Sequence, residues 1–205
     1  MSIKLIIFDM DDVLCKYDLG ARLRSLSRLS GQTPRDIRAA IWDSGFEDEA
    51  DAGKIPVENY LHQFGTRLGY PISEDEWVEA RKACMTAWPN MLAHAKRMGE
   101  KFKIALYTNN GPLTRKALPK IFPEAHALFG EKAFFSYQFN TKKPDPEAYR
   151  RLIAHLEVKP EEAWFIDDKL SNVEGARIAG LMAHHFRSEA DFIEDARALN
   201  LLNAQ

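Results

Sequence analysis

The chain has 205 residues, a formal net charge of −2 and 45% hydrophobic residues, as expected of a globular protein. The near-neutral charge offers no basic field for nucleic acid or an anionic membrane, and no apolar run approaches the roughly 20 residues of a membrane span. Only Cys15 and Cys84 occur, and the acid at Asp9 interrupts any leader-like apolar segment. We therefore expect a cytoplasmic protein without a disulfide framework or zinc site.

An apolar run near the amino terminus, residues 3–8, predicts a buried strand. Three carboxylates follow it within four positions, on Asp9, Asp11 and Asp12. Such crowding of negative charge is costly unless a cation lies beside it. The stretch is therefore either a solvated acidic turn or a cation site in which one Asp attacks a substrate.

A long helical block follows this strand, because the pattern from Cys15 to about Pro89 is entirely helical. Ser73 and Glu76 form a capping box at the start of its last helix. Helices are expected at residues 17–29, 33–42, 46–51, 57–68 and 73–87.

The length of this block indicates a separate unit. Connections from a strand to a helix usually run about 2–6 residues, so an insertion of roughly 75 residues is an added domain. We expect a helical cap domain at residues 15–88 and a core domain formed by residues 1–14 and 89–205.

Strand and helix patterns alternate in the rest of the chain. Strands are expected at residues 103–107, 133–137, 163–166 and 181–186. Helices are expected at residues 90–98, 113–121, 146–156, 173–179 and 188–201. This order predicts an α/β fold, a Rossmann-like parallel sheet core with helices on both faces, plus the inserted all-α cap. Ligands of such sheets bind at the carboxyl ends of the strands, so the insertion is placed to roof that site.

Polar residues also follow the later strands. Thr108 and Asn109 end the second core strand, just before a helix whose free N–H groups attract an anion. The fourth core strand ends in Asp167 and Asp168, so four or five carboxylates should meet at one edge of the sheet. Hard oxygen ligands of this kind suit Mg²⁺ together with a bound phosphate.

Two more side chains are candidates for the same site. Asn172 lies a few residues beyond the second acidic pair and could hold waters of the metal. Lys143 lies in a loop stiffened by Pro144 and Pro146, and its charge could neutralise carboxylates and phosphate. Taken singly, the Thr-Asn pair is also an ordinary helix start, and the lysine an ordinary solvated loop residue.

The order of these motifs resembles the haloacid dehalogenase superfamily, specifically its Mg²⁺-dependent phosphatases with a helical cap after the first motif. The four motifs are Asp-x-Asp, Thr-Asn, Lys-Pro and Asp-Asp, and the match covers nearly the whole chain. Residues 143–149 and 165–176 are similar to the branch that includes bacterial sugar-phosphate phosphatases and the phosphatase domain of soluble epoxide hydrolases.

The resemblance implies a role for each matching residue. Asp9 would be the nucleophile that forms an aspartyl-phosphate, Asp11 the general acid and base, and Lys143 the cation that orients the nucleophile. Thr108 and Asn109 would contact the phosphate. Asp168 would ligate Mg²⁺ together with Asp9 and the backbone carbonyl of Asp11. Asp167 and Asn172 would lie around these metal ligands and support them. Two positions depart from the pattern: Asp12 stands where many members carry Gly, and Asn172 where some carry a third acid.

The expected function is therefore Mg²⁺-dependent hydrolysis of a small phosphate monoester, such as a sugar or other metabolite phosphate, by a monomer or homodimer. Asp11 separates the chain from the dehalogenase branch, which needs no metal and lacks this second acid. A phosphomutase and a non-catalytic phosphate-binding protein stay open as alternatives. A response-regulator type of phospho-acceptor would need neither Asp11 nor the insertion. Trp42 and Phe46 form either the core of the cap or a wall of the substrate site.

Overall fold

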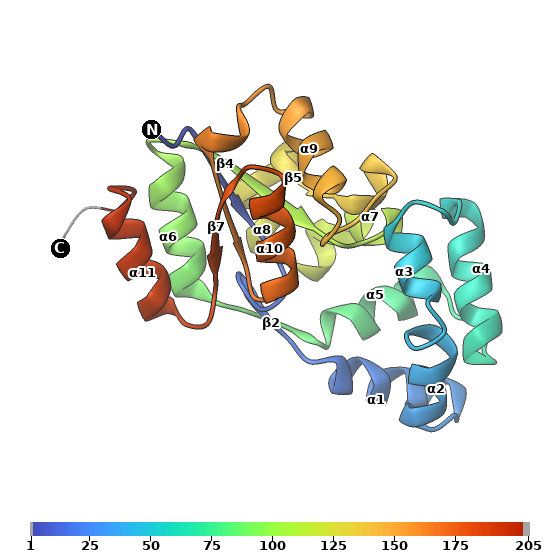
Figure 1. Cartoon of the computed structure of the whole chain (residues 1–205). Helices are drawn as coiled ribbons and strands as arrows, with labels where there is room; N and C mark the ends of the chain where they lie inside the picture. Colours follow the sequence, from blue (N-terminus) through green and yellow to red (C-terminus); the bar gives the residue numbers. More distant parts are fainter. Residues whose placement is uncertain (1, 203–205) are drawn as a thin grey trace.

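The computed structural model describes residues 2–202 and has a five-stranded parallel sheet at its centre, in the order β5-β4-β1-β6-β7. The strands are β1 (Leu5–Phe8), β4 (Lys103–Thr108), β5 (Ala133–Phe135), β6 (Ala163–Asp167) and β7 (Met182–His185). The predicted α/β fold with an inserted helical cap is confirmed (Figure 1). None of the helices within residues 2–202 combines the length and apolar character needed to cross a membrane.

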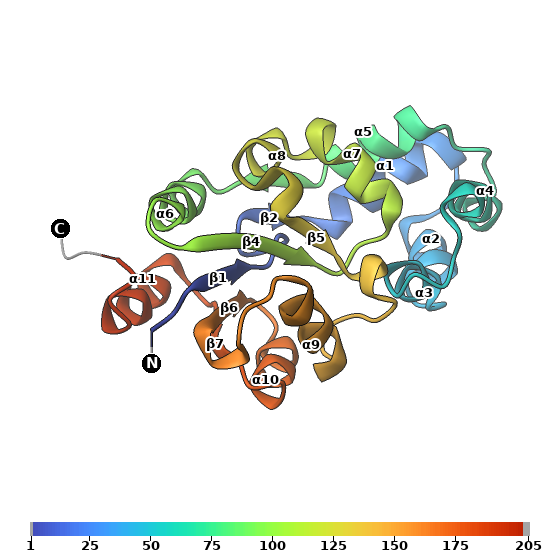
Figure 2. The ribbon, with the colours of Figure 1, turned by 90° about the horizontal axis from the view of Figure 1, so that it is seen from above.

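Helices cover both faces of the sheet (Figure 2). One face carries α6 (Pro89–Gly99), α7 (Pro112–Ile121), α8 (Pro123–Phe129) and α11 (Glu189–Ala198), and the other carries α9 (Pro146–His155) and α10 (Leu170–Ile178). Ile6 and Phe8 of β1 are buried under the first group, and Leu5 and Ile7 under the second. Burial on both sides explains why this strand reads as an unbroken apolar run.

The central position of β1 determines where the site forms. Phe8 lies opposite Leu106 of β4 on one side and opposite Ile166 of β6 on the other. The residues that follow these three parallel strands therefore leave the same edge of the sheet. The connection from β5 to β6 crosses back past β1, so the direction in which successive strands are added reverses beside β1. The carboxyl ends of the strands at such a reversal are where α/β sheets bind ligands.

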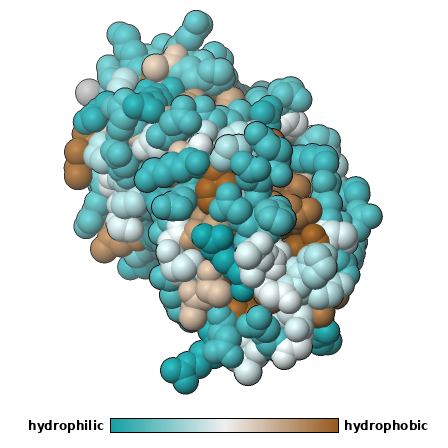
Figure 3. Space-filling model, turned by 90° about the vertical axis from the view of Figure 1, so that its right-hand side faces the viewer, coloured by the Kyte–Doolittle hydropathy of each residue, from teal (hydrophilic) through white to brown (hydrophobic). Residues whose placement is uncertain are grey.

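Five helices inserted after β1 form the cap, namely α1 (Leu19–Ser30), α2 (Pro34–Ile41), α3 (Phe46–Asp51), α4 (Val57–Leu68) and α5 (Glu74–Lys82). The side chains of Asp18, Thr33 and Ser73 accept hydrogen bonds from backbone N–H groups in the first turns of α1, α2 and α5. The surface on the cap side is mostly hydrophilic, with apolar side chains in small scattered groups (Figure 3). The apolar sides of these helices are therefore used inside the molecule.

Aromatic side chains form the interior of the cap. Phe46 stacks on Tyr60 with ring centroids 5.4 Å apart, and Trp77 meets Tyr60 edge-on at 6.1 Å. Trp42 meets Phe64 edge-on at 6.5 Å. Of the two roles considered for Trp42 and Phe46, packing in the core of the cap is the one that these contacts show.

The expectation of an entirely helical segment from Cys15 to about Pro89 is wrong at both ends. β2 (Cys15–Tyr17) and β3 (Met85–Ala87) pair as an antiparallel ribbon that joins the cap to the core (Figure 1). Accordingly α5 ends at Lys82 and does not continue to residue 87. A three-residue strand is too short to show a periodicity, and its partner lies about 70 residues away in the sequence.

Candidate active site

Asp9 directly follows β1 and is almost fully buried at the carboxyl edge of the sheet. Its Oδ1 accepts a hydrogen bond from the Met10 N–H at 2.8 Å and lies 2.9 Å from Lys143 Nζ. Burial raises the pKa of Asp9 well above its ordinary value, Lys143 opposes this effect, and the charges of Asp167 and Asp168 add to it. The charged form of Asp9 therefore depends on cations placed close to it.

Lys143 is the cation that the protein itself supplies. Its Nζ lies 2.6 Å from Asp167 Oδ2 and donates a hydrogen bond to the Tyr107 carbonyl at 3.1 Å. Burial by itself lowers the pKa of this ammonium, but the charges of Asp167 and Asp9 outweigh burial and raise it. Lys143 is therefore a buried, protonated residue of the site and not a solvated loop lysine.

The loop that carries Lys143 is fixed by contacts on two sides. The Lys143 N–H donates to Asn109 Oδ1 at 2.9 Å, and Asn109 Nδ2 donates to the Lys143 carbonyl at 2.8 Å. On the other side, a Cβ on Gly175 would lie only 2.0 Å from the Pro144 carbonyl oxygen, so a larger residue would displace the loop. The Asn109 side chain, expected to contact phosphate, lies against the backbone of Lys143.

The two acids at the end of β6 have different surroundings. Asp167 is fully buried, and its Oδ1 accepts hydrogen bonds from Asn172 Nδ2 and from the Lys169 N–H, each at 2.9 Å. With Oδ2 on Lys143, both oxygens of Asp167 have partners. In contrast, Asp168 Oδ1 is buried without a hydrogen-bond partner among residues 2–202. Asp168 therefore keeps an oxygen free for a further ligand.

Three carboxylates form a group that can hold a metal ion. One oxygen each of Asp9, Asp167 and Asp168 lies within 4.8 Å of the other two. Burial, and then the charge of Asp167, raise the pKa of Asp168 to about 6. A raised pKa and a buried oxygen without a partner both indicate negative charge that a cation would relieve. Hard carboxylate oxygens suit Mg²⁺, so the residues present fit this ion.

The raised pKa of Asp168 predicts how the stability of the metal-free protein depends on pH. Between the ordinary Asp pKa of about 4 and the folded value of about 6, the folded state binds more protons than the unfolded state. The free energy of unfolding must therefore fall as pH rises through this window. With a chelator present, the free energy of unfolding of the Asp168→Asn variant should fall less over this pH range than that of wild type. The variant should therefore melt a few degrees above wild type at pH 7. If wild type and Asp168→Asn had the same melting temperature at every pH from 4 to 7, the raised pKa of Asp168 would be contradicted.

Thr108 ends β4, is buried, and points its hydroxyl into a small polar network. Its Oγ1 accepts a hydrogen bond from Asn110 Nδ2 at 2.8 Å, and the Asn110 N–H donates to Ser136 Oγ at 3.2 Å. The Thr108 hydroxyl hydrogen is used in no hydrogen bond within residues 2–202, so it can donate to an anion. Sequence reasoning gave Asn110 no role of its own. It missed Ser136 because the strand expected at residues 133–137 runs past the observed end of β5 at Phe135.

The conformation of Asp12 explains why an Asp can stand where many members of the family carry Gly. Its φ is +58°, in the left-handed region where Gly is the usual residue. The Asp12 side chain compensates by accepting a hydrogen bond from the Tyr17 N–H at 3.0 Å, which short polar side chains can do in this conformation. An Asp at this position therefore supports the turn from β1 into the ribbon and needs no catalytic role.

Asp11 points toward the cap. Arg81 Nη2 of α5 lies 2.8 Å from Asp11 Oδ2 and 3.2 Å from Asp11 Oδ1. Cys15 Sγ also lies near this carboxylate, 3.8 Å from Asp11 Oδ1. Sequence reasoning did not find Arg81, because the pair is separated by 70 residues and helical spacing says nothing about a partner across domains.

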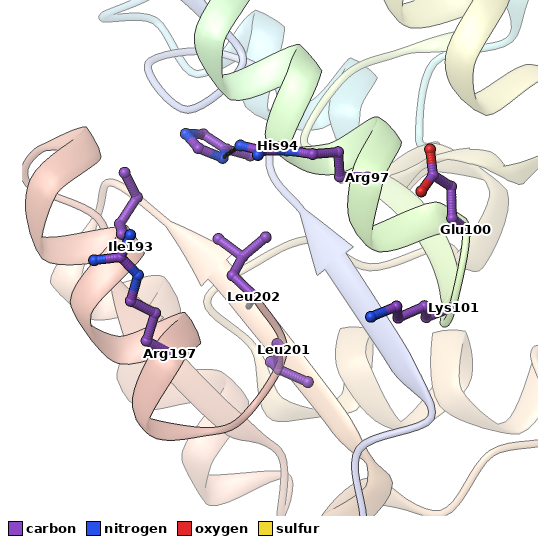
Figure 4. Close-up of a pocket in the computed structure, with 8 residues that line it drawn as sticks. All are labelled: His94, Arg97, Glu100, Lys101, Ile193, Arg197, Leu201 and Leu202. Carbon is purple, nitrogen blue, oxygen red and sulfur yellow. Dashed lines mark hydrogen bonds between the residues drawn. The ribbon is translucent and has the colours of Figure 1, made fainter. Parts of the chain in front are cut away.

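A hollow between α6 and α11 lies outside this site. It is lined by His94, Arg97, Glu100, Lys101, Ile193, Arg197, Leu201 and Leu202 (Figure 4). Lys101 comes just before the start of β4, whereas the catalytic candidates follow the ends of the strands. The hollow is therefore at the opposite edge of the sheet.

The family of the chain follows from a comparison with family models. The model for haloacid dehalogenase-like hydrolases matches residues 3–180, a span that includes every candidate site residue described above. The chain belongs to the haloacid dehalogenase-like hydrolases, which confirms the resemblance seen in the motifs. It is therefore a hydrolase of this family.

Related proteins carry phosphatase names. The chain is 28% identical to Phosphatase MT3486 of Mycobacterium tuberculosis, over 90% of this chain and 87% of the relative. It is 24% identical to D-ribitol-5-phosphate phosphatase of Bacteroides thetaiotaomicron, over 94% and 96%. A HAD family enzyme of Bacteroides thetaiotaomicron, solved with magnesium and inorganic phosphate, shares the fold with a TM-score of 0.74 and 19% identity, over 92% and 96%.

Proposed function

We propose that the protein is a Mg²⁺-dependent phosphatase that hydrolyses a small phosphate monoester, such as a sugar or other metabolite phosphate. One observation carries the proposal: Asp9 lies at a strand end beside the buried ammonium of Lys143 and two further acids, with the Thr108 hydroxyl at the end of the neighbouring strand. This set provides a nucleophile, anion-binding groups and a cation site. The names of the relatives support the same class of substrate.

In the first half-reaction, a carboxylate oxygen of Asp9 attacks phosphorus. The bond from this oxygen to phosphorus forms as the bond from phosphorus to the leaving oxygen breaks, and Asp11 gives a proton to that oxygen. Lys143 and the Thr108 hydroxyl offset negative charge on the phosphoryl oxygens. The products are the free alcohol and an aspartyl-phosphate.

In the second half-reaction, water opens the aspartyl-phosphate. Asp11, now ionised, takes a proton from the water as it attacks phosphorus, and the Asp9 carboxylate leaves. Asp11 has regained from water the proton that it gave to the alcohol, so the enzyme is restored and inorganic phosphate is released. Splitting the reaction in this way replaces one difficult displacement by two easier steps.

The metal site lies beside the nucleophile. Asp9, Asp168 and the backbone carbonyl of Asp11 would hold Mg²⁺, while Asp167 and Asn172 support the ligands. When bound, the ion offsets the charge that the carboxylates and the phosphate bring together. The wild-type enzyme solved with magnesium and inorganic phosphate supports this choice of ion. A cytoplasmic location and a monomeric or dimeric state stay predictions.

A phosphate-release screen across metabolite phosphates tests the proposal. Activity should vanish in excess chelator and return with Mg²⁺, and Ca²⁺ should substitute poorly because it prefers more ligands and looser geometry. After the same treatment with chelator and Mg²⁺, the Asp168→Asn variant should show little activity, which ties the metal requirement to this site. Transfer of the phosphoryl group to a second sugar without release would favour a phosphomutase, and full activity in the metal-free protein would reject the metal site.

A further inference from the structure

The ion pair between Asp11 and Arg81 joins the catalytic loop to the cap. Arg81 lies near the end of α5, and its Nη2 is within 3.2 Å of both Asp11 oxygens. The Arg81 side chain is 2% exposed, whereas 26% of the Asp11 side-chain surface remains exposed. The guanidinium therefore holds one side of the carboxylate, and another side stays open for a leaving group.

Arg81 is itself fixed by the ribbon that joins cap and core. Its guanidinium lies 4.5 Å from the ring centroid of Tyr17 in β2. Its Nη1 lies 3.7 Å from Cys84 Sγ, and Cys84 directly precedes β3. A planar, always charged guanidinium held on two sides presents its donors in one direction. The direction in which Arg81 meets Asp11 is thus determined by where the ribbon lies.

This contact differs from the other ionic contacts between cap and core. These other contacts are Lys116 with Glu74 at 2.7 Å, Lys120 with Asp75 at 3.3 Å and Lys142 with Asp48. At least one side chain of each pair is largely exposed, and such pairs contribute little. A buried guanidinium that loses its carboxylate is costly, so the Arg81 pair favours a cap that is seated on the core. It also reaches a residue that the proposed reaction uses.

We propose that Arg81 is a positioning residue for Asp11. While the cap is seated, Arg81 holds the Asp11 side chain in the orientation from which its acid form protonates the leaving group, and Arg81 pairs with the carboxylate that this step leaves. Cap closure and proton transfer are thereby coupled. This inference rests on the proposed phosphatase function. Arg81 acts through Asp11 and makes no bond to the reacting atoms.

The dependence of the rate on the leaving group tests this role. p-Nitrophenol is a far stronger acid than phenol, so its phosphate ester needs less proton donation to break. With Mg²⁺ and the full-length protein, Arg81→Gln should lower kcat/KM for phenyl phosphate at least about ten-fold more than for p-nitrophenyl phosphate. Arg81→Lys, which keeps a cation within reach, should recover part of the loss. Equal slowing of both esters would overturn the proposal.

A double-mutant cycle separates positioning from a structural effect. If Arg81 acts only through Asp11, adding Arg81→Gln to Asp11→Asn should change neither kcat/KM value more than about two-fold. The matched control is Arg22→Gln, because Arg22 is an equally buried cap arginine that packs between Trp42 and Trp77. It should lower the melting temperature and leave the ratio of the two esters unchanged. A further loss in the double mutant, or the same ratio change in the control, would count against the coupling.

Hydrogen exchange tests the contact without any activity. Asp11→Ala should speed exchange of the amides in residues 78–87 several-fold relative to wild type, because Arg81 loses its partner. Asp168→Ala removes another acid of the site that does not touch Arg81, and should leave these amides unchanged. Unchanged exchange in Asp11→Ala would overturn the proposal even if an Arg81 variant failed to fold. Absence of phosphate release by the wild type would instead reject the phosphatase function and leave this contact measurable.

Discussion

Asp9→Asn is expected to leave less than about 1% of wild-type phosphate release, with the fold intact. The amide has nearly the shape of the carboxylate but cannot attack phosphorus. Lys143 keeps two other partners, Asp167 and the Tyr107 carbonyl, so its charge is not left alone when Asp9 becomes neutral. Because one of three crowded acids is removed, the melting temperature of the metal-free variant should equal or exceed that of wild type.

Asp12→Asn is the matched control for this experiment. It makes the same chemical change three residues further on, at a position where Asn tolerates the left-handed conformation. Its amide oxygen can still accept the hydrogen bond from Tyr17, so the turn should persist and most activity should remain. If Asp9→Asn retained more than about 1% of activity while Asp12→Asn lost it, the nucleophile would have to be reassigned.

Asp11→Asn should separate the two half-reactions. p-Nitrophenyl phosphate has a leaving group acidic enough to depart without a donated proton, so the aspartyl-phosphate should still form on Asp9. Its hydrolysis needs a base and should stall, lowering steady-state turnover by about 10²–10⁴. A sugar phosphate also needs a donated proton for its leaving group in the first step, so it should lose the first step too. A rapid-quench time course with both esters at one Mg²⁺ concentration measures this difference.

The expected signature is a burst of nitrophenol near one equivalent per enzyme, without a comparable burst from the sugar phosphate. Asparagine keeps an oxygen that can accept from Arg81, so the contact with the cap is disturbed less than by alanine. Equal slowing of both esters without a burst would show that Asp11 serves the geometry of the site and not proton transfer.

Most elements of the core could be predicted because their signals are local, although α8 was not among them. The apolar run before Asp9 and the alternation of strand and helix patterns after Pro89 lie within a few residues of each element that they predict. Helix ends were equally readable where a capping side chain was present, as at Thr33 and Ser73. The ribbon of β2 and β3 was missed because each strand exists only through its pairing with the other.

The sequence alone determined which strand-end residues gather at the site, and only the tertiary structure decided which atoms they touch and which further residues join them. Asp9, Thr108 and Asp167 each follow or end a parallel strand, and neighbouring strands of one sheet must bring such positions to one edge. The side chain of Asn109 lies on the backbone of Lys143, and Asp11 meets Arg81 of the cap. Such partners depend on how distant segments approach one another in space, and periodicity records only which side of a strand or helix is buried.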